Sequence, residues 1–245
     1  TGNYDWIMPE DHDMRPLNDK ENDLLYILMF FKEEKKTWPK NLFMFDINLK
    51  TSAYHHICNV YDEYVDSLYL ACRPGCDTCC TINVTMTALE GYLIAEALEA
   101  TGRMNVLDSL KQHVSRQRFI PQFTFNRLTE MIVEQETVPE EAIDPSWGPC
   151  PFLSENTCPI YDVRPFACRC LVSQKTCRRG EYALMSPLTV AVNHVMLQYI
   201  EHIDSNGFTG NMTDVLILMR SAENRKQYRE GYLAVQGQPV IPNFP

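Results

Sequence analysis

Apolar residues recur at helical spacing along most of the chain. The segment 18–35 shows this spacing with acidic residues first and lysines last, an order that suits the helix dipole. A second helix is predicted over about residues 51–70, and it delivers the chain directly into Cys72. These two segments define a predicted N-terminal helical region, residues 1–70.

Capping residues place the next helix. Thr87 followed by Glu90 makes a capping box for a helix that runs to about Ala100, and Gly102 closes it. Further helices are predicted over residues 104–118, 123–136, 187 to about 207, and 215–222. No run of residues alternates strongly enough to form more than a hairpin of sheet. The pattern therefore predicts a mainly α fold, a helical array with at most a small hairpin.

The end of the chain has a different character. Residues 236–245 contain three prolines and show no period, so we expect an extended arm on the surface. The helices before it and this extended tail make up a third predicted region, residues 181–245.

Composition narrows the class of protein. The 245 residues are 45% hydrophobic, which excludes disorder over most of the chain. The net charge of −10 argues against nucleic acid as a partner, because such binders neutralise phosphates with Lys and Arg. The apolar stretch 24–31 is far shorter than the roughly 20 residues of a membrane span. We expect a cytoplasmic protein with no membrane span.

Nine of the ten cysteines are concentrated in two nests, and Cys58 stands apart. Four fall in the run CRPGCDTCC, residues 72–80, and five more lie between Cys150 and Cys177. Disulfides usually spread through small secreted domains that lack a core, and adjacent cysteines rarely bridge each other. Thiolates two or three residues apart can instead converge on a metal ion or cluster. The helical array is therefore expected to enclose an irregular cysteine-rich metal-binding segment, residues 71–180.

Local charge agrees with this interpretation. Five basic residues and one acidic residue lie between Asn156 and Gly180, in an otherwise acidic chain. Guanidinium groups near bound thiolates can offset the negative charge of the sulfur atoms. An exposed basic loop is the simpler alternative. The six histidines show no metal-binding pattern such as HExxH and are expected to be ordinary surface or core residues.

The two nests resemble the YkgJ-type cysteine-cluster family, described as zinc- or iron-chelating domains. The resemblance rests on CRPGCDTCC, then CPFL at 150–153, Ile160-Tyr161, Arg164-Pro165 and Cys168-Arg169. It covers roughly residues 70–180. It implies eight metal ligands: Cys72, Cys76, Cys79, Cys80, Cys150, Cys158, Cys168 and Cys177. Cys58 and Cys170 stand outside the pattern.

Two weaker resemblances concern the same cysteines. The run CDTCC is similar to the corresponding run of flagellin lysine methylases, which implies a protein-lysine methylase acting with a sulfonium cofactor. The spacing of Cys72, Cys76 and Cys79 is similar to that of radical S-adenosylmethionine enzymes. Those enzymes continue with alternating strands and helices, whereas the sequence here continues as helices.

The sequence favours an iron-sulfur cluster, of the 4Fe-4S type, over zinc. Structural zinc sites usually take well-separated ligand pairs, whereas clusters accept irregular nests and a remote cysteine followed by proline. Cys150-Pro151 and Cys158-Pro159 both have that feature. The hypotheses are an iron-sulfur protein with a redox or cluster-dependent role, a zinc-stapled structural or interaction module with an unknown protein partner, and the methylase. Whether the protein is an enzyme, and its catalytic residues, stay open.

Overall fold

The computed structural model describes residues 46–178 and 181–244, so the helix predicted over 18–35 lies outside the described residues. The α-helices are α2 (Ile47–Asp66), α3 (Ala88–Ala100), α4 (Phe125–Val133), α5 (Phe166–Arg169), α6 (Pro187–Ile203), α7 (Met212–Met219) and α8 (Ala222–Arg229). Short 3-10 helices span Met104–His113, Pro145–Trp147 and Tyr161–Val163. The strands are β1 (Thr85–Thr87), β2 (Phe208–Asn211) and β3 (Val240–Pro242). The predicted mainly α fold with a small sheet is confirmed.

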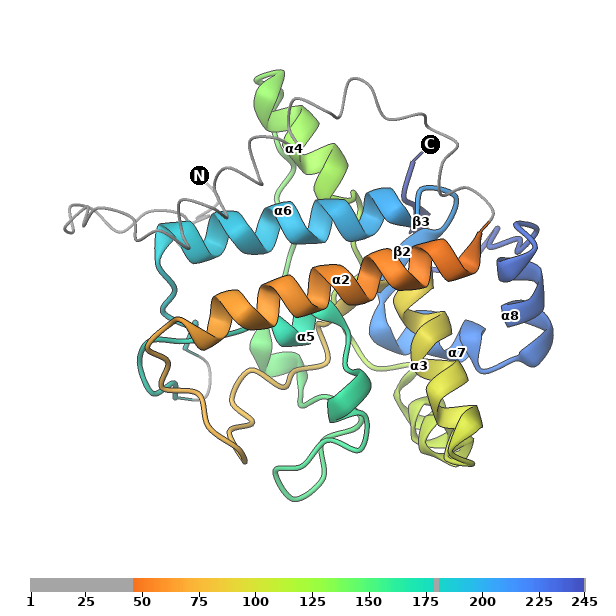
Figure 1. The fold of residues 1–245 in the computed structure, drawn as a ribbon, viewed down its shortest axis with the longest axis horizontal. Coiled ribbons are helices and arrows are strands. Elements are labelled where there is room, and N and C mark those ends of the chain that lie inside the picture. The colour runs from red at the N-terminus through yellow and green to blue at the C-terminus, as the bar shows by residue number, and fades with distance from the viewer. Residues whose placement is uncertain (1–45, 179–180, 245) are drawn as a thin grey trace.

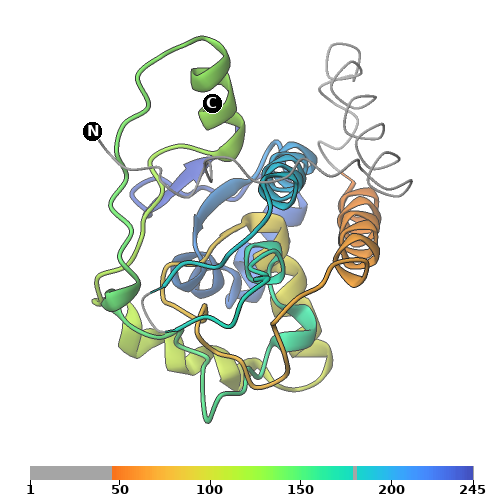
Figure 2. The same ribbon diagram turned by 90° about the vertical axis from the view of Figure 1, so that its left-hand side faces the viewer.

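The two longest described helices, α2 and α6, run side by side in opposite directions (Figure 1). Two pairs of buried side chains join them. The Tyr61 hydroxyl donates to Asn193 Oδ1 at 2.7 Å, and the hydroxyls of Tyr64 and Thr189 lie 2.9 Å apart. Figure 2 shows that α2 lies at one edge of the molecule, with α6 between it and α4.

Helix α3 starts and ends as the capping residues predict. The Thr87 side chain accepts from the Glu90 N–H, while the Glu90 carboxylate accepts from the Thr87 N–H. Gly102, just past the end of α3, has φ +66°, a conformation that favours glycine. Gly91 lets α7 approach closely, because a Cβ there would lie 2.6 Å from Val215 Cγ1. Helices α3 and α7 therefore form a tightly packed pair.

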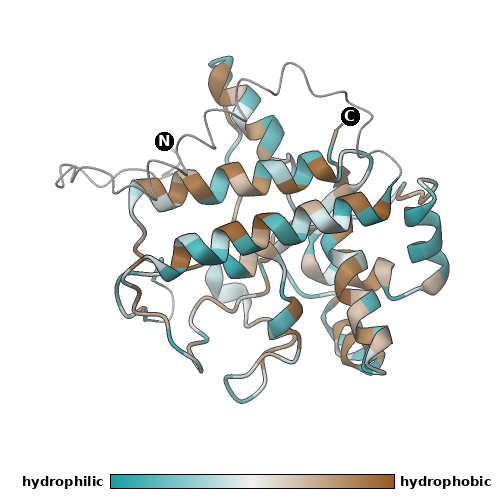
Figure 3. Cartoon of the chain, viewed as in Figure 1, coloured by the Kyte–Doolittle hydropathy of each residue, from teal (hydrophilic) through white to brown (hydrophobic). Residues whose placement is uncertain are grey.

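Two other helices differ from the predictions. The segment predicted as a helix over 104–118 is a 3-10 helix that ends at His113. Helix α8 was not predicted, since its sequence AENRKQYR has no apolar stripe. Figure 3 shows this largely polar character beside the alternating polar and apolar positions of α2 and α6. Helix α8 is anchored by single residues, Arg225 and Tyr228, which are buried.

The C-terminal arm is extended, as predicted, but it is not simply on the surface. Strand β2 lies at the centre of an antiparallel sheet in the order β1-β2-β3, with Thr209 opposite Ile241. Asn243 is 1% exposed, accepts from the Thr209 hydroxyl at 2.7 Å and donates to the Asp204 carbonyl at 2.7 Å. The arm docks because the outer edge of β2 offers backbone groups that need hydrogen-bond partners.

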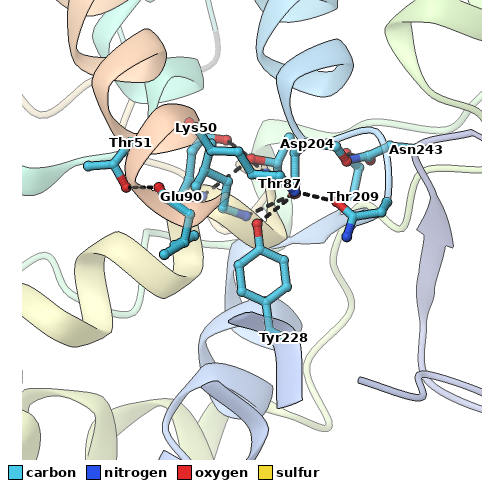
Figure 4. Close-up of polar contacts among 11 residues, drawn as sticks. Lys50, Thr51, Thr87, Glu90, Asp204, Thr209, Tyr228 and Asn243 are labelled. Atoms are coloured by element: carbon cyan, nitrogen blue, oxygen red, sulfur yellow. Dashed lines mark hydrogen bonds and ion pairs between the residues drawn. The ribbon is translucent and has the colours of Figure 1, made fainter. Parts of the chain in front are cut away.

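A buried polar network lies where α2, α3, α6 and α8 meet (Figure 4). Lys50 Nζ lies 3.0 Å from Asp204 Oδ1 and also bonds Asn206. The Asp204 carboxylate accepts from the Tyr228 hydroxyl at 2.6 Å and from the Leu89 N–H at 2.9 Å. The charged groups of Lys50 and Asp204 are thus paired inside the protein.

Residues from all three sequence segments share one hydrophobic core, including Tyr61, Leu89 and Val215. The division into 1–70, 71–180 and 181–245 stays a prediction. The packed helices hold the cysteine-bearing segments beneath α2 and α6, at the end away from α8 (Figure 1).

Candidate metal centre

The two cysteine nests lie side by side although about 70 residues separate them. The Cys150 N–H donates to the Cys80 carbonyl at 2.9 Å, and the Ile82 N–H donates to the Gly148 carbonyl at 3.1 Å. At the other end of the first nest, the Ala71 N–H donates to the Ser173 carbonyl at 2.8 Å. Backbone bonds therefore fix the two segments against each other at both ends.

Helix α5, which carries Cys168, is held by side chains of three other helices. The Phe166 N–H donates to Glu90 Oε1 of α3 at 2.7 Å, and Asn193 Nδ2 of α6 donates to the Cys170 carbonyl at 3.0 Å. The Tyr61 ring of α2 packs edge-on against Phe166 with centroids 4.8 Å apart. These contacts place Cys168 against the core.

Three of the cysteines form an outer set, which is defined here as Cys72, Cys76 and Cys177. They line one cavity of about 230 Å³, together with Arg73 and Lys175 among others. Cys72 and Cys76 are exposed, and Cys177 is half-buried. The Ser173 N–H donates to Cys72 Sγ at 3.3 Å, a bond that favours a thiolate. Burial outweighs that bond and raises the pKa of Cys72, with smaller contributions from nearby thiols, Cys76 and Cys177 among them.

Three others form an inner set, defined as Cys150, Cys158 and Cys168. Cys150 is buried, and the other two are half-buried against the core. Burial raises the pKa of Cys150 to about 11 and that of Cys168 well above its ordinary value. Cys150 and Cys158 raise the pKa of Cys168 further, so the three thiols are electrostatic neighbours.

The adjacent Cys79 and Cys80 lie at the junction of the two sets. The interaction with the Cys80 thiol, followed by burial, raises the pKa of Cys79. Cys79 also raises the pKa of Cys72 in the outer set and of Cys168 in the inner set. The pair thus connects both groups.

The basic residues of the second nest serve several roles. Arg164 stacks on the Tyr161 ring at 3.8 Å and lowers the pKa of Cys158 against the larger effect of burial. Arg169 instead pairs with Asp62 of α2 at 2.8 Å. Lys175 lies 3.7 Å from Glu181. The interpretation that these groups offset thiolate charge therefore fits Arg164, whereas Arg169 fastens the nest to α2.

The donor chemistry of both sets fits a thiophilic metal. All ten cysteines fall within the described residues and are free thiols, and soft sulfur ligands suit zinc or iron-sulfur clusters. Within residues 46–178 and 181–244, no three Cys, His, Asp or Glu side chains already stand as a metal-holding group. Binding would therefore have to draw the neighbouring thiols of a set together. These thiols are clustered and buried and have raised pKa values, and a bound cation would stabilise their ionised form.

A family comparison agrees with this donor set. Residues 71–186 match the family model CxxCxxCC, described as a putative zinc- or iron-chelating domain. The match spans just under half of the chain and includes all eight cysteines of the YkgJ-type pattern. The protein thus carries a metal-binding cysteine-cluster domain, as the YkgJ-type resemblance predicts.

No curated protein and no solved structure matches the chain. The resemblance to flagellin lysine methylases is therefore not supported by the comparisons. No helix within residues 46–178 and 181–244 has the length and apolar character of a membrane span.

Cys58 and Cys170 differ from the CxxCxxCC-pattern cysteines in their surroundings. Cys58 lies outside the family match, buried in α2, and burial raises its pKa to about 11. Cys170 lies within the match and is also buried, with a pKa raised to about 12, mainly by burial. Its thiol donates to the Ala167 carbonyl at 3.6 Å, and its own carbonyl accepts from Asn193. Cys170 therefore contributes a backbone anchor to the site.

Sequence reasoning did not find the residues that position α5. Glu90 was identified as a capping residue, but its bond to the Phe166 N–H joins segments 76 residues apart. Helices α2 and α6 carry three more of these residues, Asp62, Tyr61 and Asn193. The apolar pattern of a helix predicts its buried face but not the polar contact that a single residue makes. The spacing of residues along one helix carries no information about such long-range partners.

Proposed function

We propose that the CxxCxxCC domain of this protein binds an iron-sulfur cluster of the 4Fe-4S type and serves a redox or cluster-dependent role. One observation carries the proposal. The bond from the Cys150 N–H to the Cys80 carbonyl joins the two nests directly, so thiols from both can reach one centre. The candidate metal ligands are the eight CxxCxxCC-pattern cysteines: Cys72, Cys76, Cys79, Cys80, Cys150, Cys158, Cys168 and Cys177. A 4Fe-4S cluster takes four of them, and the other four would bind a second centre or serve a structural role.

The arrangement supports iron-sulfur over zinc in two respects. Cys79 and Cys80 are adjacent in the sequence, unlike the well-separated ligand pairs of structural zinc sites. Both Cys150 and Cys158 precede proline, as remote cluster ligands often do. A bound cluster would supply electron transfer or Lewis acidity, and the protein's own residues would orient the thiols and limit water around the inner set.

The deciding experiment is the visible spectrum, with iron, zinc and sulfide content, of protein purified without air. We expect sulfur-to-iron charge-transfer absorption and acid-labile sulfide. Stoichiometric zinc with a colourless, sulfide-free protein would overturn the proposal in favour of the zinc-stapled module. Electrochemistry then tests the redox role, because a cluster that cannot be reduced within the biological range would remove it.

Two neighbouring cysteines provide a matched pair of variants. Cys168→Ala removes a proposed ligand. Cys170→Ala removes a thiol outside the proposed set and keeps the backbone carbonyl by which Cys170 anchors the site. We expect Cys168→Ala to lose the metal and Cys170→Ala to keep it. Equal metal loss in both variants would contradict the proposed ligand set.

Cellular location is part of the same proposal. The free state of all ten cysteines is typical of a reducing compartment. We therefore place the protein in the cytoplasm, which fractionation of the native host would test.

A further inference from the structure

We propose that the outer set, Cys72, Cys76 and Cys177, forms a second metal site, separate from the inner centre and open to an external ligand. The inference rests on the proposed function, because it divides the proposed ligands between two different metal centres. The inner centre would use Cys150, Cys158 and Cys168 with the Cys79–Cys80 pair. The outer site would bind one divalent ion through three thiolates.

The first argument is the difference in exposure. Cys72 and Cys76 are exposed, whereas Cys150 is buried and Cys158 and Cys168 pack against the hydrophobic core. A single centre would need exposed loop thiols and core-packed thiols to converge on the same metal.

The second argument is the position of Cys79. Its thiol pairs with that of Cys80 and neighbours both Cys168 and Cys72. It does not line the outer cavity, whereas all three outer cysteines do. The outer set therefore has three thiols for a metal that prefers four ligands. Metal sites with three protein ligands keep the fourth position for water or substrate.

The cavity indicates what that fourth ligand is. Its volume of about 230 Å³ is below the roughly 300–1,000 Å³ of pockets for drug-sized ligands, so it suits a small molecule. Arg73, Lys175 and Asp77 line it. Lys175 and Glu181 are about half exposed and 3.7 Å apart, a weak pair that leaves the lysine able to attract an anion. The chemistry favours a small anionic donor, and a thiolate suits a thiophilic metal best.

The first test separates the two centres by mutation in the full chain. Cys72→Ser/Cys177→Ser should lose the metal that a chelator removes quickly, while the sulfide and slowly removed metal stay. Cys158→Ser/Cys168→Ser should lose the inner centre. Thr176→Ala, an exposed cavity position without a thiol, is the control and should change neither. Far-UV circular dichroism verifies that each variant is folded.

The outcomes distinguish this inference from the proposed function. If wild-type protein purified without air holds no thiol-bound metal, the proposed function fails and the inference fails with it. If wild-type protein holds metal but the outer double variant loses all of it, a single centre exists and this inference alone is overturned.

The second test examines the open position. Co²⁺ in the outer site should give ligand-field bands that shift when 2-mercaptoethanol is added, and Cys72→Ser/Cys177→Ser should abolish these bands. Outer-site bands that do not respond to the added thiol would show that the protein itself fills the fourth position, and would overturn the open site.

Discussion

The helical scaffold and the cysteine nests both bury ionisable groups, but they surround these groups differently. In the scaffold, Lys50 and Asp204 are 3% and 0% exposed and their charged groups lie 3.0 Å apart, so the ammonium lowers the pKa of the carboxyl against the larger effect of burial. In the nests, the neighbours of Cys168 that affect its pKa, after burial, are other thiols, and all of them raise it. The scaffold contains its own counter-charges, whereas the inner thiols would obtain theirs from a bound metal.

This contrast suggests a division of labour. Helices α2, α3 and α6 are joined by side-chain bonds that need no cofactor, and from that frame they hold α5 through Phe166 and Cys170. We therefore expect the frame to persist without metal and the nests to depend on it.

The largest expected effect is on the buried ion pair. Asp204→Asn leaves the Lys50 ammonium buried without its counter-charge, which should lower the free energy of unfolding by ~3–5 kcal/mol. Urea unfolding followed by circular dichroism measures this. The control is Arg220→Ala, which removes an ion pair with Asp108 whose side chains are 40% and 49% exposed. Such an exposed pair is worth ~0–1 kcal/mol. A loss in Asp204→Asn no larger than in the control would contradict a charged buried pair.

Glu201 is another buried ionisable group of the scaffold, and N–H groups hold its carboxylate by hydrogen bonds. It therefore allows the scaffold side of the comparison to be tested by pH. It is 2% exposed and accepts from the Phe125 and Asn126 N–H groups, each at 2.9 Å. Burial raises its pKa from 4.5 to about 7. Between these two values the folded protein holds a proton that the unfolded chain has lost. The free energy of unfolding should therefore fall by ~3 kcal/mol as the pH rises through this window.

The measurement is the free energy of unfolding at several pH values from 4 to 8. Glu201→Gln cannot titrate, so its curve should lack the decrease that wild-type protein shows over this window. Its absolute stability is expected to be lower, because an amide NH₂ would face backbone donors. Parallel curves for the two proteins would show that another group causes the decrease.

Much of the scaffold could be predicted from local sequence. The box of Thr87 and Glu90 and the terminal Gly102 fix α3, because capping acts over three or four residues. Helix α8 and strand β3 could not be predicted in the same way. Their positions depend on distant partners, such as Asp204 for Tyr228 and strand β2 for Val240–Pro242.

The candidate site was predicted in kind but not in arrangement. Cysteine spacing and the family resemblance name the donors, because ligands close in sequence share a turn. Nothing in that spacing assigns Cys177 to the same cavity as Cys72, a grouping set by the bond from the Ala71 N–H to the Ser173 carbonyl. The ligand set itself stays a prediction until metal content is measured.

Asn193 tests the link between frame and nest. Asn193→Ala removes the bonds to the Tyr61 hydroxyl and the Cys170 carbonyl, leaving buried partners unsatisfied, at a cost of ~1–3 kcal/mol. Amide hydrogen exchange should show the largest loss of protection in α5. The control, Asn224→Ala, removes one bond to the Leu218 carbonyl on the opposite side of the frame. Faster exchange confined to α6, with α5 unchanged, would contradict the role of Asn193 in holding the nest.

The smallest expected effect on the scaffold comes from metal removal. A chelator applied to metal-loaded protein should strip protection from amide exchange in residues 71–82 and 148–178, where loops carry the proposed ligands. Helices α3, α6 and α7 should keep their protection, because their contacts are packed apolar groups and internal hydrogen bonds. Far-UV circular dichroism should therefore change little. If metal removal unfolded α3 and α7 together with the nests, the frame would depend on the metal, and the contrast between the two regions would fail.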